Sequence, residues 1–466
     1  MTQLDLTRIP LVRRALVARG PQLAVQLAAV AGLLLVIMAG LIGTPVGSRN
    51  PATVMVWIAW WAVLMIVAVP FFGRLWCGIC PLPLPGEWLQ RGALLRPRGG
   101  GFGLPSRTGV PPALAARTVG LAWPRRLRGL WVQNGAFLLV ALFSLPVLTQ
   151  PRLTAFLLAG LVLFAIAISL VFERRSFCRY LCPVGGFVGL YAQAAPLEIR
   201  VRDAQVCAAH TTKTCYTGSA DGYGCPWMVF PAALKSNVAC GVCLECLRTC
   251  PLDNIAIRLR PMGADLSTAS RVPLDEVFKS LVLLGSALVY AFVLLGPWSA
   301  LRSAAAAVGT PSWLAYVAAF LVVTVVLVPA FFLAATRLGG LTARSRLSLL
   351  DGMQRFAPAL VPLGLAAWAA FSLGFLLTNI SYILPVLSDP IGLGWDLLGT
   401  ASFPWTPLGG GLAPWALVAI LLAGLAWSSR RVRAVADEVA GGVRMAAPVW
   451  GFAFVVTAGL LWVFVA

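Results

Sequence analysis

The most regular feature of the chain is a series of apolar runs, each about long enough to cross a membrane as a helix. A hydrocarbon core of about 30 Å needs roughly 20 helical residues, and nine runs approach or exceed that length. They lie at residues 22–45, 52–72, 130–149, 152–172, 277–299, 313–335, 357–385, 412–428 and 445–466. The pattern therefore predicts an all-α polytopic membrane protein with about nine transmembrane helices.

Composition and charge agree with a membrane protein and indicate its orientation. Only 11% of the 466 residues are charged and 59% are hydrophobic, whereas a soluble domain carries about 25% charged residues. With the N-terminus inside, the nine spans place all but three of the 36 Lys and Arg residues on the inner side; the exceptions are Arg49, Arg152 and Arg302. This is the positive-inside bias, so we expect a cytoplasmic N-terminus and an external C-terminus. The net charge of +20 then reflects topology rather than binding of nucleic acid.

One long segment, residues 173–275, is not apolar enough to cross. Its central part, residues 200–262, holds seven of the 11 cysteines. We therefore expect three parts in the chain. Residues 1–199 form two helical hairpins, each ending in a Cys-Pro motif; residues 200–262 form an inserted cytoplasmic ferredoxin-like domain with two clusters; and residues 263–466 form a C-terminal five-helix membrane domain.

The most specific motif is the run Cys240-x-x-Cys243-x-x-Cys246-x-x-x-Cys250-Pro251. Bacterial ferredoxins bind 4Fe-4S clusters with this spacing, because three thiolates two residues apart curl around one cubane and soft sulfur ligands suit iron-sulfur clusters. A structural zinc site usually separates its ligands into two pairs, and disulfides are rare where cytoplasmic thiols stay reduced. The run therefore predicts an iron-sulfur cluster.

A second cluster is expected from the cysteines upstream. In two-cluster ferredoxins the fourth cysteine of each run binds the other cluster, and Cys225-Pro226 repeats the Cys250-Pro251 ending. The two expected 4Fe-4S clusters are then divided as follows: the first on Cys240, Cys243, Cys246 and Cys225, the second on Cys207, Cys215 and Cys250.

Seven thiolates leave the second cluster one ligand short of two complete cubanes. His210 is the only histidine of the chain and follows Cys207 by three residues, where a ferredoxin places its second cysteine. Imidazole also binds iron. The alternatives are a solvated His210 beside a three-iron cluster, or a cluster completed by water, by Asp203 or by Asp221. A single histidine also excludes a membrane haem held between two histidines.

The other four cysteines form two pairs at the inner ends of the hairpins. The pairs read Arg74-Leu-Trp-Cys77-Gly-Ile-Cys80-Pro81 and Arg175-Ser-Phe-Cys178-Arg-Tyr-Leu-Cys182-Pro183, so the hairpin with its motif is an internal repeat. Each motif precedes a stretch, 87–90 and 187–193, suited to lying along the membrane interface. Two hairpins side by side would bring four thiolates together, which suffices for a third cluster. A reducible dithiol, or thiols that only pack, are the alternatives.

Hairpins ending in Cys-Pro motifs and followed by ferredoxin-type cysteines resemble the membrane polyferredoxin family. Its members are related to NapH, the quinol dehydrogenase membrane subunit of periplasmic nitrate reductase systems, and to the membrane part of NosR. The resemblance covers residues 22–262. It implies a bacterial plasma membrane protein that passes electrons between the quinone pool, or a cytoplasmic donor, and a membrane or extracytoplasmic redox partner protein. Such a protein is an electron-transfer subunit rather than a stand-alone enzyme.

Two other functions would use the same cysteines. A redox-sensing regulator or a maturation factor for a respiratory metalloenzyme would bind clusters through identical ligands, so the residues do not separate these functions from electron transfer. A transporter with a cluster-bearing regulatory domain is disfavoured, because the C-terminal spans are nearly free of the ionisable residues that mark proton relays.

Overall fold

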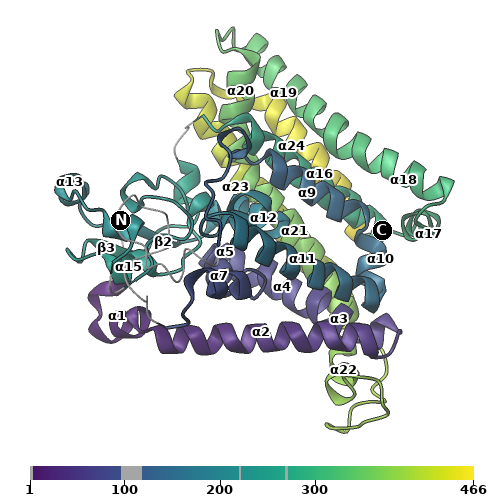
Figure 1. Ribbon diagram of the computed structural model, residues 1–466. Helices are drawn as coiled ribbons and strands as arrows, with labels where there is room; N and C mark the ends of the chain where they lie inside the picture. The colour runs from purple at the N-terminus through teal and green to yellow at the C-terminus, as the bar shows by residue number, and fades with distance from the viewer. Residues whose placement is uncertain (1–3, 96–117, 220–221, 268–270, 466) are drawn as a thin grey trace. The chain divides into compact units, whose positions relative to one another are not determined.

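A computed structural model describes residues 4–95, 118–219, 222–267 and 271–465 of the chain (Figure 1). The chain divides into two compact units. Unit 1 comprises residues 1–37, 68–136 and 156–265, and unit 2 comprises residues 38–67, 137–155 and 266–466. All 11 cysteines lie in unit 1.

The described residues include eight helices that are long and apolar enough to cross a membrane. They are Arg19–Ile42, Pro51–Phe72, Pro151–Val171, Leu274–Leu295, Pro311–Thr342, Leu349–Ser388, Gly410–Glu438 and Gly442–Val465. Several of these contain short breaks or wider turns, such as the π-type turns Val54–Trp60 and Leu64–Ala68 within the second. The chain is therefore a largely helical protein compatible with several passes through a membrane.

The structure differs from the expected nine spans at residues 130–149. This segment forms two shorter helices, α9 (Trp131–Leu142) and α10 (Ser144–Thr149), with a break at Phe143. Pro146 explains the break, because it has no N–H to donate to the carbonyl of Leu142 and its ring crowds that carbonyl. Phe143 instead donates its N–H to Val140, three residues back.

Unit 1 contains a small antiparallel sheet in the order β1-β3-β2. β1 spans Leu4–Asp5, β2 spans Leu197–Val201 and β3 spans Ile255–Leu259. β2 and β3 are paired from Leu197 opposite Leu259 to Val201 opposite Ile255. The sheet thus joins the two ends of the cysteine-rich segment, and it lies close to α15 (Glu245–Thr249) in Figure 1.

A compact core lies beneath this sheet. It includes Ile199 and Ile257 from the strands and Val242 and Leu247 from the ferredoxin-type run, together with the cysteines Cys215 and Cys246. Short helices complete the region: α1 (Pro10–Val17), α13 (Ala204–Ala209) and α14 (Thr214–Thr217). The cysteine-rich segment therefore folds around its own hydrophobic core within unit 1.

Short helices also follow the two Cys-Pro motifs. α5 (Val69–Phe72) and α6 (Leu75–Ile79) precede Cys80, and α7 (Leu84–Arg91) follows it with Glu87 and Gln90 buried and Leu89 exposed. The equivalent helix after Cys182 is α12 (Pro183–Tyr191), and almost all of it is buried. The prediction that residues 187–193 lie along a membrane interface is therefore wrong, since this helix is apolar all round and packs inside the unit.

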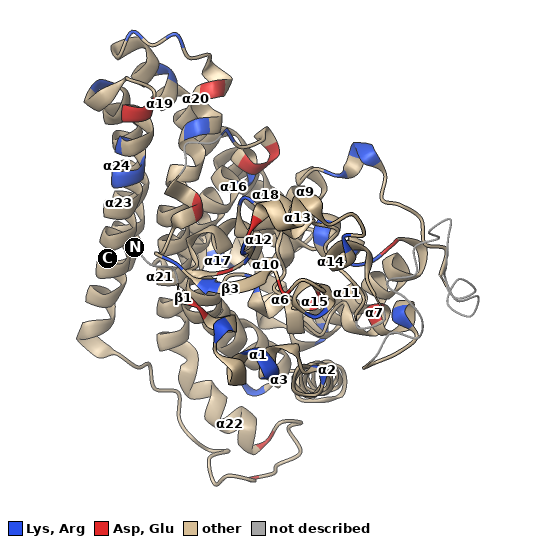
Figure 2. Cartoon of the chain, turned by 90° about the vertical axis from the view of Figure 1, so that its left-hand side faces the viewer, with Lys and Arg blue, Asp and Glu red and all other residues tan. Residues whose placement is uncertain are grey.

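Unit 2 contains the C-terminal helices. They are α16 (Leu274–Tyr290), α17 (Ser299–Ala306), α18 (Pro311–Leu321), α19 (Val328–Thr342), α20 (Leu349–Phe356), α21 (Val361–Asn379), α22 (Ile383–Ser388), α23 (Ala413–Glu438) and α24 (Gly442–Val465). α23 packs against both α21 and α24. Gly424 permits the close approach to α21, because a Cβ there would lie 2.2 Å from the Cβ of Ala366. Figure 2 shows basic residues of this unit gathered at one end of the helices around α19, α20 and α24.

Candidate iron-sulfur sites

The 11 cysteines are all free thiols and fall into three groups within unit 1. We name these groups by their residues. The Cys-Pro group is Cys77, Cys80, Cys178 and Cys182; the run group is Cys225, Cys240, Cys243 and Cys246; and the cavity group is Cys207, Cys215 and Cys250.

The Cys-Pro group draws two thiols from each repeat into one buried place. Burial raises the pKa of the Cys80 thiol, and the neighbouring thiols of Cys182 and Cys77 raise it further. Burial likewise raises the pKa of Cys178 well above its usual value; Arg175 lowers it, and the same three thiols raise it. Each thiol therefore senses the others, and the two repeats meet at their cysteines.

The second Cys-Pro motif is shaped by the start of α12. Cys182 is the N-cap residue of this helix, and its Sγ accepts a hydrogen bond from the N–H of Gly185 at 3.2 Å. Pro183 occupies the first helical position, where its missing N–H is not needed. Gly185 has no room for a side chain, because a Cβ would lie 2.9 Å from the carbonyl oxygen of Cys178. Burial raises the pKa of the Cys182 thiol to about 11, although the hydrogen bond from Gly185 lowers it.

The run group brings Cys225 to the three closely spaced cysteines. Burial raises the pKa of Cys243, and Cys225 and Glu245 raise it further. Burial also raises the pKa of Cys246, as do Cys243, Cys240, Cys225 and Cys215. The four cysteines that the spacing assigned to the first cluster therefore lie near one another, with Cys215 also close to them, and their assignment to one cluster stays a prediction.

The backbone of the run is tightly curled. Val242 and Leu244 both have left-handed backbone angles, with φ of 47° and 68°. Gly241 is required beside them, because a Cβ there would lie 1.9 Å from Nε1 of the buried Trp227.

The cysteine run contains a buried carboxylate, that of Glu245, which binds a side chain and a backbone group outside the run. Glu245 is bonded by Arg19 at 2.8 Å and by Arg248 at 3.0 Å, and it accepts the N–H of Tyr223 at 3.0 Å. Although burial raises the pKa of Glu245, the nearby guanidinium groups, that of Arg91 foremost, lower it to about 2. The carboxylate therefore stays ionised and is occupied by cations and backbone.

The cavity group lines a small cavity together with His210. Asn254 donates its backbone N–H to Sγ of Cys250 at 3.4 Å and its side-chain amide to Sγ of Cys207 at 3.2 Å. Burial raises the pKa of Cys215 to about 12, and Cys250, Cys207 and Cys225 also raise it. The three thiols assigned to the second cluster are thus gathered around one space.

Of the candidates for the missing ligand that the structure describes, His210 is the one that lines this cavity. Its Nε2 lies 2.8 Å from the hydroxyl oxygen of Thr212. Asp203 instead caps α13, accepting the N–H of Gln205 at 2.7 Å, and it does not line the cavity. Asp221 lies outside the described residues.

No three His, Cys, Asp or Glu side chains among the described residues come close enough to hold a single metal ion. In a cubane each thiolate binds a different iron, and the four sulfurs surround a body several atoms wide. The donor set fits such a cluster, because iron-sulfur clusters are held by cysteine thiolates.

Arginines of the second repeat connect it to the segment around Cys225. Arg174 donates to the carbonyl of Cys225 at 2.8 Å, the N–H of Arg175 bonds the carbonyl of Pro226 at 3.1 Å, and Arg179 donates to the carbonyl of Met228 at 2.7 Å. The sequence motifs contain Arg74 and Arg175, but their role was not predicted. Their equivalent position, three residues before the first cysteine of each pair, could have indicated that both arginines act at the cysteines.

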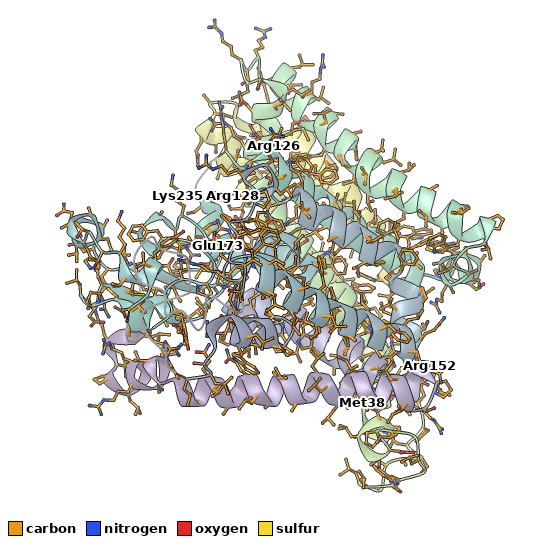
Figure 3. All side chains as sticks on the ribbon, in the orientation of Figure 1. Met38, Arg126, Arg128, Arg152, Glu173 and Lys235 are labelled. Atoms are coloured by element: carbon orange, nitrogen blue, oxygen red, sulfur yellow. The ribbon has the colours of Figure 1, made fainter. Side chains whose placement is uncertain are left out.

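The segment before α9 also packs on the second repeat. Trp123 stacks on Tyr180 with ring centroids 5.3 Å apart, and Leu121 accepts the N–H of Glu173 at 2.9 Å. Figure 3 labels Glu173 and also Arg126 and Arg128, which follow Trp123 along this segment. Tyr180 lies between Cys178 and Cys182, so this stacking covers the second pair.

Comparison with known proteins supports iron-sulfur binding. A family model described as a 4Fe-4S binding domain matches residues 53–102 and 154–201. The two matched segments contain the two Cys-Pro pairs and end before Cys207. No curated protein and no solved structure matches the chain. The match and the apolar helices together define an iron-sulfur membrane protein.

Proposed function

We propose that the chain is an integral membrane electron-transfer protein that relays electrons between the quinone pool, or a cytoplasmic donor, and a membrane or extracytoplasmic redox partner. The observation that carries the proposal is the gathering of the seven cysteines of residues 200–262: Cys225 lies near Cys240, Cys243 and Cys246, and Cys207, Cys215 and Cys250 line one cavity. Iron-sulfur clusters, when bound, accept and release single electrons.

The run group would hold one 4Fe-4S cluster with four thiolates. The cavity group would hold the second with three thiolates and His210, whose ring the hydroxyl of Thr212 helps to orient. Polar second-neighbour contacts of this kind tune a metal ligand. Asn254 contributes in the same way through its bonds to the sulfurs of Cys207 and Cys250.

An apolar groove beside the first Cys-Pro motif supports the quinone part of the proposal. The groove has a volume of about 420 Å³ and is lined by Pro85, Trp88, Leu89, Gly92, Ala93 and Leu94. Ligand pockets of about 300–1,000 Å³ with mostly apolar walls suit flat organic ligands. The groove lies along α7, which begins four residues after Cys80 in the sequence.

Orientation follows from the distribution of basic residues, which favours a cytoplasmic location for residues 200–262. The resemblance to the NapH and NosR group supports the same orientation. Electrons would enter or leave the protein at the cytoplasmic face, and a partner protein would exchange them with it.

The proposal is tested with full-length protein purified anaerobically in detergent. We expect menadiol, a soluble quinol, to bleach the visible absorption of the clusters, and Trp88→Ala to raise the menadiol concentration needed for half-maximal reduction. Trp131→Ala is the matched control, because Trp131 is exposed and lies outside the groove. Clusters that dithionite reduces but neither menadiol nor reduced flavodoxin reduces would contradict electron transfer. They would favour the redox sensor.

A further inference from the structure

We propose that Cys77, Cys80, Cys178 and Cys182 hold a third iron-sulfur cluster, shared between the two repeats, with Arg74 and Arg175 as its cationic neighbours. This goes beyond the two-cluster proposal, since it concerns the hairpin repeats rather than residues 200–262. It does not depend on exchange of electrons with quinone.

The two motifs are fixed to each other by a side chain of the second that binds the backbone of the first. Arg175 of the second repeat donates to the carbonyl of Cys77 in the first at 2.6 Å. Gln26 holds the carbonyl of Gly78 at 3.1 Å, and Gln133 holds that of Cys178 at 3.2 Å. Polar side chains thus bind carbonyl groups of both motifs, and Arg175 links the second motif directly to the first.

Backbone N–H groups donate hydrogen bonds to sulfurs of the Cys-Pro group. The Sγ of Cys80 accepts the N–H of Leu82, and that of Cys182 accepts the N–H groups of Val184 and Gly185. The run group has the same arrangement, in which a thiol accepts the N–H of the residue two positions on; the pairs are Cys225 with Trp227, Cys240 with Val242 and Cys243 with Glu245. Hydrogen bonds to sulfur are a standard feature of iron-sulfur ligands, whereas a thiol that only packs is a weak acceptor.

Arg74 is a buried cation without a carboxylate partner among the described residues. Arg74 is 5% exposed and forms no ion pair among the described residues. It donates to the carbonyl of Val238 and lies over the Trp227 ring at 4.2 Å. Its Nε and one terminal nitrogen have no hydrogen-bond partner within the described part of the chain. A buried unpaired guanidinium is costly, so an anion is expected beside it.

The charges around the Cys-Pro group are positive overall. Glu87 pairs with Arg175, but Arg91 shares the same carboxylate, and Arg74 is added without a carboxylate of its own. Neutral thiols or a disulfide would leave this excess uncompensated. Four thiolates around a cluster supply negative charge at that point. A zinc ion with four thiolates would also be anionic, so metal analysis is needed to distinguish it from a cluster.

The same two arginines lie between the Cys-Pro group and the run group. Arg74 interacts electrostatically with Cys182 and with Cys240, and Arg175 does so with Cys178 and with Cys243. Arg74 and Arg175, which occupy equivalent positions in the two repeats, therefore each interact with both the Cys-Pro group and the run group. A cluster on the Cys-Pro group would be the nearest neighbour of the run cluster, and the repeats would be part of the electron path rather than only its support.

The test is metal and sulfide content of anaerobically reconstituted full-length protein. We expect the double variant Cys80→Ser/Cys182→Ser to lose about four iron atoms per chain, roughly a third of the wild-type content, and to keep the signals of the other two clusters in electron paramagnetic resonance. Cys243→Ser is the matched control, since it changes a thiol of the run group and should remove a different signal. Unchanged iron in the double variant, or zinc in the wild type, would overturn the third cluster.

A second measurement avoids variants that fail to fold. In wild-type protein, iodoacetamide labelling of Cys80 and Cys182 should rise at least tenfold after iron is removed with a chelator. Equal labelling before and after chelation would show that these thiols hold no iron. Neither readout uses quinol, so a failure here is distinguishable from a failure of the electron-transfer proposal.

Discussion

Arg175 and Glu87 form a buried ion pair that joins the second Cys-Pro repeat to the helix that follows the first. Nε of Arg175 donates to Oε2 of Glu87 at 2.8 Å, and both side chains are 2% exposed. Glu87 raises the pKa of Arg175 against the effect of burial, and the thiols of Cys178 and Cys243 also raise it. The two repeats are therefore held in register by charge as well as by packing.

Glu87→Gln should destabilise unit 1 strongly. Removing one partner of a buried pair leaves the other charge without compensation, which costs about 3–5 kcal/mol. We expect a clear fall in the thermal unfolding midpoint in detergent, with loss of iron at the same temperature. Arg13→Gln is the control, because Arg13 pairs with Asp253 at the surface with 42% and 52% of the side chains exposed. Exposed pairs contribute less than about 1 kcal/mol, and equal shifts in the two variants would contradict the role of the Glu87 pair.

Arg74→Gln should lower the midpoint potential of the clusters on both sides of it. A nearby positive charge stabilises the reduced, more negative form of a cluster, so its removal makes reduction harder. Each 1.4 kcal/mol of lost interaction corresponds to about 60 mV for one electron. The measurement is a redox titration followed by electron paramagnetic resonance. Arg126→Gln, at an exposed position of unit 1, should leave the potentials unchanged; identical shifts in both variants would show that only net charge matters.

His210→Cys should lower the potential of the second cluster while retaining its iron. Neutral imidazole in place of thiolate removes negative charge, as it does in the high-potential Rieske centres, and a thiolate would restore that charge. His210→Ala should instead lose about one iron atom or admit water. Thr212→Ala is the milder control, since it removes only the contact to Nε2. If all of these proteins titrate like the wild type, His210 is an ordinary loop residue.

Much of the site could be predicted from spacing, because short gaps between cysteines limit where their sulfurs can go. The separation of Cys225 from Cys207 and Cys215 was predicted from the exchange of fourth ligands in ferredoxins. Cys207, Cys215 and Cys250 line one cavity, and Cys225 also interacts with Cys215, so the division of the thiols between two clusters stays a prediction. The roles of Arg74 and Glu87 could not be predicted, since contacts between residues far apart in sequence depend on how the repeats pack. Pro146 could have predicted the break at Phe143, but the length of the apolar run alone does not reveal it.

The topology prediction concerns residues 200–262. All but three of the Lys and Arg residues lie on the cytoplasmic side of the membrane when this segment is cytoplasmic, as the positive-inside rule expects. A green fluorescent protein fused after residue 262 should therefore fluoresce, whereas alkaline phosphatase should be active when inserted in the acidic loop after α22, near Trp395. Reversed activities would place the clusters outside and remove the proposed cytoplasmic entry of electrons.

The most direct test of the account is the iron and acid-labile sulfide content of the anaerobically reconstituted wild-type protein, together with a spin count of its reduced clusters. The account predicts about seven to eight iron atoms on the cysteines of residues 200–262, and about eleven to twelve when the Cys-Pro group is included. Zinc in place of iron, or four iron atoms or fewer per chain, would contradict it.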